Sequence, residues 1–153
     1  MTPEDVPAVV EVQAPAAIVG LAAVFPQEQH PFPRDEVAQR WLEEIATADI
    51  DCFVIVHGSV ISGFAAVRGD ELLHFGTALD HWGTGLAQRA HDELLDTMRS
   101  RGVPKACLRV FTDNGRGRSF YENLGWRATD QRSRSAYPPF PELLRYERSL
   151  SDR

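Results

Sequence analysis

The segment Trp82-Gly83-Thr84-Gly85-Leu86-Ala87-Gln88 joins a β-rich run to a helical pattern, and it limits the fold more than any other part of the sequence. Gly83 and Gly85 let a ligand approach the backbone closely, because neither carries a side chain. Apolar residues then recur at helical spacing from Leu86 to Met98. The first N–H groups of a helix have no internal acceptor and lie at the positive end of its dipole. The segment therefore predicts a strand, a turn and a helix that together bind a phosphate group.

Other glycine-rich motifs fit this segment poorly. A dinucleotide-binding turn needs a third small residue where Gln88 stands. A P-loop needs Gly-Lys followed by Ser or Thr, and a hydrolase elbow needs Gly-x-Ser-x-Gly. Neither sequence is present in the chain. Glycine turns without a ligand stay an alternative when this segment is taken by itself.

The pattern of apolar, turn and capping residues predicts alternating helices and strands around the turn. Pro15 is expected to break the first helix, and Asp35 to cap the helix that follows the proline-rich loop Pro26–Pro33. The expected helices are Thr2–Gln13, Ala16–Ala23, Asp35–Ala48, Gly85–Arg99 and 114–124, and the expected strands are Cys52–Val56, Val60–Val67, Glu71–Ala78, Ala106–Thr112, Trp126–Thr129 and Leu143–Leu150. The first three strands should form an antiparallel meander, and Leu79–Thr84 and Asp130–Pro141 should be loops, the second of them mobile.

Length and composition are typical of one globular domain over residues 1–153. The net charge of −6 disfavours nucleic acid as the main partner. The acidic start of the chain, its lack of a long apolar run and its two isolated cysteines favour a cytoplasmic protein with no membrane span and no metal site. Residues 1–71 hold twelve acidic side chains and three basic ones. That imbalance favours a cationic partner, although it also serves plain solubility.

Two motifs resemble those of the GCN5-related N-acetyltransferases. Ala78–Ala87 is similar to their acetyl-CoA loop, Gln/Arg-x-x-Gly-x-Gly/Ala, with Trp82 in place of Gln/Arg as in the ribosomal-protein acetyltransferase branch. One helix and one strand later, 114–126 is similar to Asn-x-x-Ala-x-x-hydrophobic-Tyr-Glu-x-hydrophobic-Gly-Phe. The chain departs from the family in lacking a strand before Thr2, in Leu79 for a common Pro and in Gly117 for Ala.

The resemblance implies an α/β (α+β) fold, with a mixed, mostly antiparallel central sheet that is flanked by helices and splayed into a V-shaped cleft. It implies acetyl-CoA as co-substrate, with the pyrophosphate held by backbone amides of the turn. It also implies that a strand edge pairs with the pantetheine arm. The residues it assigns to the co-substrate are Phe75, Gly76, Thr77, Gly83, Thr84, Gly85, Leu86, Ala87, Gln88 and Asn114.

For catalysis, the resemblance implies that Tyr121 protonates the departing thiolate; a core aromatic is the alternative. The acceptor is expected to be a primary amine of a small molecule or peptide, which must lose a proton before it attacks. Glu71 matches the position of the base in the histone-acetylating branch. His74 and a water relay are its rivals. Strand alternation would put Glu71 and Phe75 on one face and His74 on the other, unless a bulge intervenes.

Two questions stay open at this stage. A domain that binds acyl-CoA as a sensor, without transferring the acyl group, is the alternative to an enzyme. The sequence also leaves the oligomeric state open, with a homodimer as one option.

Overall fold

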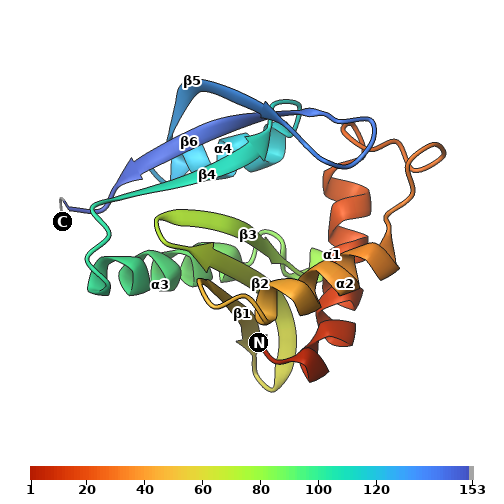
Figure 1. Cartoon of the computed structure of the whole chain (residues 1–153), viewed down its shortest axis with the longest axis horizontal. Coiled ribbons are helices and arrows are strands. Elements are labelled where there is room, and N and C mark those ends of the chain that lie inside the picture. The colour runs from red at the N-terminus through yellow and green to blue at the C-terminus, as the bar shows by residue number, and fades with distance from the viewer. Residues whose placement is uncertain (152–153) are drawn as a thin grey trace.

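A computed structural model describes residues 1–151, in which a six-stranded mixed sheet separates two layers of helices (Figure 1). The strands follow the order β1-β2-β3-β4-β6-β5 across the sheet. All neighbouring strands pair antiparallel except β3 and β4, which pair parallel. The elements are η1 (Pro3–Asp5), α1 (Val6–Gly20), α2 (Arg34–Ile45), β1 (Ile50–His57), β2 (Val60–Arg68), β3 (Glu71–Thr77), η2 (Leu79–His81), α3 (Leu86–Ser100), β4 (Lys105–Phe111), α4 (Gly115–Asn123), β5 (Arg127–Arg134) and β6 (Glu142–Ser149).

The alternation of side chains along β2 divides the core into two clusters on opposite faces of the sheet. Ala65 and Val67 belong to the cluster that includes α3 and the strands β4 and β6. Phe64 and Ala66 belong to the cluster that includes α1 and α2. Two-sided burial explains why β2 is apolar along most of its length, and it fixes both helical layers to the same strand.

The sheet opens between β3 and β4. Only two residue pairs join these strands, Glu71 with Cys107 and Leu72 with Leu108. Beyond them, β3 continues beside β2 and β4 continues beside β6, so the two halves of the sheet separate. The mixed, mostly antiparallel sheet with flanking helices and a splayed centre is confirmed.

A β-bulge in β3 overturns the expected placement of Glu71, His74 and Phe75. Leu72 pairs with Val67 and His74 pairs with Ala66, so Leu73 is an extra residue in β3. The alternation of side chains therefore shifts by one position after Leu72. His74 lies on the α2 side together with Glu71, and Phe75 packs on the opposite cluster.

The helices and one loop differ in detail from expectation. Helix α1 runs through Pro15 without a break, because its buried residues Val6, Val9 and Ala14 hold it against the sheet. Helix α2 begins at Arg34, so Asp35 lies in its first turn rather than at the cap.

The expected loop Asp130–Pro141 was also partly wrong. Strand β5 extends through Arg134, because its backbone pairs with β6 although its side chains are polar. In the described part of the chain, the first element is η1, which leads directly into α1. None of the described helices has the length and apolarity needed to cross a lipid bilayer.

Candidate active site

The turn after β3 has the geometry of an anion site. Gly83 and Gly85 adopt positive φ angles of 79° and 89°, which favour glycine. Gly85 is the N-cap residue of α3. The amides of Gly83, Gly85, Ala87 and Gln88 have no acceptor among the described residues. Thr84 supports the turn, because its hydroxyl donates to the carbonyl of His81. Free amides at the N-terminus of a helix are the arrangement to which phosphate groups bind in proteins.

Arg116 reaches this turn from the start of α4. Its guanidinium lies 3.3 Å from the centre of the Trp82 ring. No acidic side chain pairs with Arg116 in the described residues. Partial burial lowers the pKa of its guanidinium. Trp82 is itself fixed by α1 and β3, since a Cβ on Gly20 would lie 3.3 Å from the indole, and its Nε1 donates to the Thr77 carbonyl over 3.3 Å. An unpaired cation thus stands at the edge of the anion site.

The separation of β3 from β4 leaves a cavity of about 550 Å³, here called the β3–β4 cleft. Its walls include Phe75, Gly76 and Thr77 on one side and Leu108 to Phe111 on the other. On the edge of β3 that faces β4, residues beyond Leu72 have no strand partner. An extended ligand with amide groups could satisfy that edge in place of a strand.

Tyr121 and Asn114 close the far wall of the cleft, on and before α4. The Tyr121 ring packs against Trp126 with centroids 5.9 Å apart, and its hydroxyl has no hydrogen-bond partner among the described residues. Burial raises the pKa of Tyr121, so the phenol stays protonated and can donate. Asn114 caps α4 by accepting from the Gly117 amide over 3.0 Å. A Cβ on Gly117 would lie 2.5 Å from the Asn114 amide nitrogen, which explains the departure from Ala at this position.

A second cavity of about 470 Å³, here called the α1–α2 cavity, opens between the first two helices, the Pro26–Pro33 loop and the sheet. It meets the β3–β4 cleft, because both are lined by Gln13, Ala17, Leu21, Leu73, His74, Arg109 and Phe111. His74 is therefore one of the residues that border both spaces. Glu71 lines the α1–α2 cavity but not the β3–β4 cleft.

His74 belongs to a charged cluster with Glu44 and Arg40 of α2. The Nε2 atom of His74 lies 2.9 Å from both carboxylate oxygens of Glu44. Only the contact with Oε1 has hydrogen-bond geometry, and Arg40 Nε also donates to Oε1 over 3.0 Å. The Oε2 atom is buried and has no donor. Burial opposes ionisation of Glu44, but the hydrogen bonds and charges of His74 and Arg40 outweigh it and lower its pKa.

Glu71 is held by an ion pair across the narrow end of the sheet opening. Its Oε2 accepts from Arg109 Nε of β4 over 3.1 Å. The bulge brings Glu71 and His74 to the same cavity, so both expected bases face it. The described residues contain no cluster of His, Cys, Asp and Glu suited to a metal ion.

Three residues of this region escaped the sequence analysis. Glu44 and Arg116 gave no signal, since charged residues on helices usually face solvent. His91 sits in the expected helical pattern, yet it is fully buried and accepts from Trp126 Nε1 over 2.9 Å. The one signal in the sequence was its position next to the apolar stripe of the predicted helix Gly85–Arg99.

Comparison with solved structures gives many chains of the same fold. They include an N-acetyltransferase (PaiA) from Thermoplasma acidophilum in complex with coenzyme A (19% identity, TM-score 0.81, 97% of this chain and 95% of that chain covered). An acetyltransferase from Thermus thermophilus is similar as well (18% identity, TM-score 0.76, 97% and 93% covered). So is the ribosomal-protein-S18-alanine N-acetyltransferase from Escherichia coli (19% identity, TM-score 0.70, 100% and 92% covered).

A search of curated protein sequences gave no significant match. The family model described as the acetyltransferase (GNAT) family matches residues 16–126, which is more than half of the chain and includes the phosphate turn, the β3–β4 cleft and Tyr121. The chain therefore belongs to the GNAT acetyltransferase family, the acetyltransferases that use acetyl-CoA as co-substrate.

Proposed function

We propose that the chain transfers the acetyl group of acetyl-CoA to a primary amine by direct attack, with both substrates bound at once. The observation that carries this proposal is the junction of two cavities. The β3–β4 cleft ends in an anion site, the α1–α2 cavity carries carboxylates, and the two share His74. An enzyme with a covalent intermediate would need a nucleophile at the junction. Cys52 and Cys107 line neither space.

For co-substrate binding, the proposal assigns the pyrophosphate to the amides of the turn and to the Arg116 guanidinium. The backbone of Phe75, Gly76 and Thr77 pairs with the amide groups of the pantetheine arm. Asn114 borders the same cleft. Three features support this assignment. The free amides and the Arg116 cation match the pyrophosphate of acetyl-CoA, and the open edge of β3 matches its pantetheine arm. The full set proposed to contact it is Phe75, Gly76, Thr77, Gly83, Thr84, Gly85, Leu86, Ala87, Gln88, Asn114 and Arg116.

For catalysis, acetyl-CoA supplies the acetyl group as a thioester. His74 lies where the cavities meet, and it receives on Nδ1 the proton that the acceptor ammonium must lose, because its Nε2–H donates to Glu44. The amine nitrogen then forms a bond to the acetyl carbon, the carbon–sulfur bond breaks, and Tyr121 gives its proton to the thiolate. The second proton of the amine nitrogen leaves as the amide forms and restores the Tyr121 hydroxyl. Glu71 is the second candidate for the base. Its carboxylate is engaged by Arg109, and it does not reach the β3–β4 cleft.

The co-substrate part of this proposal is tested by titrating acetyl-CoA into the Gly85→Glu variant in a calorimeter. The carboxylate placed in the anion site should abolish measurable binding. Gly58→Glu is the matched control, because Gly58 also has a positive φ, of 64°, but lies in the β1–β2 turn. Unchanged affinity in Gly85→Glu would exclude the assigned site. The transfer itself is tested by thiol release over an amine library. Binding of acetyl-CoA without release for any amine would favour the sensor instead.

A further inference from the structure

The α1–α2 cavity has the size of a small-molecule site rather than of a protein-docking surface. Its volume of about 470 Å³ lies within the range of pockets that enclose drug-sized ligands. It communicates with the β3–β4 cleft through His74 and Arg109. An acceptor bound there is therefore a small molecule that reaches the thioester with one end.

The charges in this cavity are nearly balanced. Glu71 is paired with Arg109, and Glu44 Oε1 is paired with Arg40 and His74. Glu36 is exposed at the outer wall. Glu44 Oε2, on a side chain that is 12% exposed, lies 2.9 Å from His74 Nε2 but accepts no hydrogen bond from the described residues. A protonated amine supplies both the missing donor and the opposite charge.

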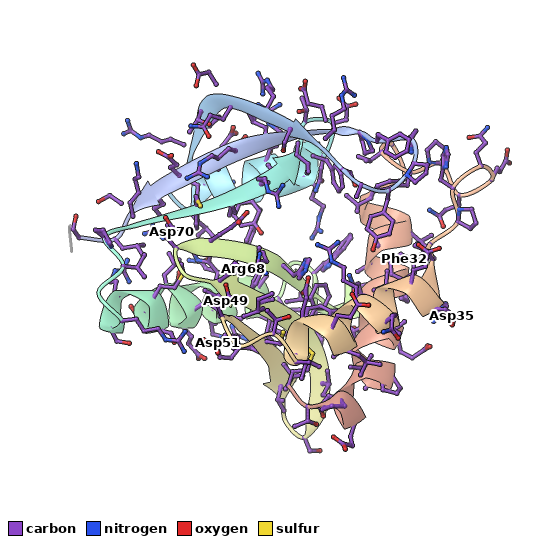
Figure 2. The ribbon with its side chains drawn as sticks, viewed as in Figure 1. Phe32, Asp35, Asp49, Asp51, Arg68 and Asp70 are labelled. Atoms are coloured by element: carbon purple, nitrogen blue, oxygen red, sulfur yellow. The ribbon has the colours of Figure 1, made fainter. Side chains whose placement is uncertain are left out.

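Three further acids of the first half of the chain, Asp49, Asp51 and Asp70, lie outside this cavity. Figure 2 shows Asp49, Asp51 and Asp70 toward the end of the sheet that lies away from Phe32 of the cavity wall. Asp49 pairs with Arg68 over 3.4 Å, and Asp51 pairs with Arg101. These three acids therefore add no charge to the wall of the α1–α2 cavity. A second ammonium inside it would meet the guanidinium groups of Arg40 and Arg109.

The rest of the cavity wall is apolar and aromatic. Phe25 and Phe111 meet edge to face with centroids 5.3 Å apart, and Trp41 lies beside His74 with centroids 5.1 Å apart. Phe32 comes from the loop on the opposite side. Such walls bind ring-bearing or bulky apolar groups.

From these observations we infer that the acceptor is a monoamine with an aromatic or similarly bulky apolar body, and that its ammonium is bound by Glu44 Oε2. This inference rests on the proposed function. Deprotonation by His74 then occurs beside the anchoring carboxylate, at the mouth of the β3–β4 cleft. Amines with several charges are excluded by Arg40 and Arg109.

The test compares phenethylamine with spermidine, with acetyl-CoA at saturation and thiol release as the readout. The value of kcat/KM should be at least tenfold higher for phenethylamine. Glu44→Gln should lower it at least tenfold for phenethylamine, mainly through the KM of the amine, and leave the KM of acetyl-CoA unchanged. Glu43→Gln is the matched control, because Glu43 is on the same helix but outside the cavity. It should change neither value. A preference for spermidine, or full activity in Glu44→Gln, would overturn the inference.

A second variant guards against misfolding of Glu44→Gln. Arg109→Gln leaves Glu71 unpaired and so adds a second free carboxylate, which should raise the rate with spermidine relative to phenethylamine at least tenfold. An unchanged ratio would contradict the charge argument.

Binding of phenethylamine to the protein saturated with coenzyme A, measured by calorimetry, separates the two levels of the proposal. Binding that Glu44→Gln abolishes supports the anchor even when no acetyl group is transferred, in which case the proposed function alone fails. Turnover of other amines with no binding of phenethylamine overturns the inference alone.

Discussion

Tyr121 is the half-buried residue that we propose as the proton donor in the β3–β4 cleft. Its ring packs against Trp126, the residue lines the β3–β4 cleft, and its hydroxyl has no hydrogen-bond partner among residues 1–151. The Tyr121→Phe variant should lower kcat by about 100-fold, because it removes only the proton donor. The KM of acetyl-CoA should stay the same. Steady-state kinetics check both values, and a wild-type kcat would make Tyr121 a core residue only.

Arg116 is the residue whose contribution is easiest to isolate. The Arg116→Gln variant should raise the Kd of acetyl-CoA about tenfold, because a charged hydrogen bond to phosphate is typically worth about 1.5–3 kcal/mol. Arg127→Gln is the matched control, since Arg127 is on β5, away from both cavities. Calorimetric titration measures each variant. Equal affinities in the two variants would remove Arg116 from the site.

At the level of single elements, helix α1 contains Pro15 in its interior, and this proline lowers the stability of the helix. Pro15 has no N–H to donate to Glu11, and its side chain is exposed. Pro15→Ala should therefore raise the free energy of unfolding by about 2 kcal/mol. Pro7→Ala should change it little, because Pro7 lies in the first turn, where no helical hydrogen bond is lost. Urea denaturation compares the two, and a loss of stability in Pro15→Ala would contradict the argument.

The elements also show where the sequence was informative. The turn after β3, the meander and the helix after Asn114 were predicted because glycines, apolar periodicity and caps act locally. The bulge at Leu73 was not, because Leu73 is apolar like its neighbour and only the pairing with β2 creates the extra residue. The prediction ended strand β5 too early, because its residues are polar and are held in the strand by pairing with β6. The meeting of Glu44 with His74 depends on the packing of α2 on the sheet, which no local pattern encodes.

At the scale of the whole molecule, His91 links α3 to the C-terminal half. Its Nε2 accepts from Trp126, so the neutral ring carries its proton on Nδ1, beside Asp92. Burial lowers the pKa of His91 although Asp92 opposes the shift. Below a pH of about 6.5 the histidine of the unfolded chain binds a proton that the buried ring does not, so stability falls as the pH is lowered.

The lowered pKa of His91 predicts that the free energy of unfolding, measured by urea denaturation, is smaller at pH 5.5 than at pH 7.5. The His91→Gln variant should be less stable at pH 7.5 and should lose less between the two values, because its side chain does not titrate. An equal loss in both proteins would assign the pH dependence to other groups.

The short β3–β4 ladder has a consequence for the solubility of the protein when no acetyl-CoA is bound. Among the described residues, two residue pairs join the halves of the sheet, so β3 and β4 each leave a strand edge open along the β3–β4 cleft. Open edges are the usual starting points for pairing between chains. Acetyl-CoA, once bound along β3, would cover that edge and act as a guard against aggregation as well as a reactant. The supply of acetyl-CoA would then set how long the protein stays in solution, and not only how fast it works.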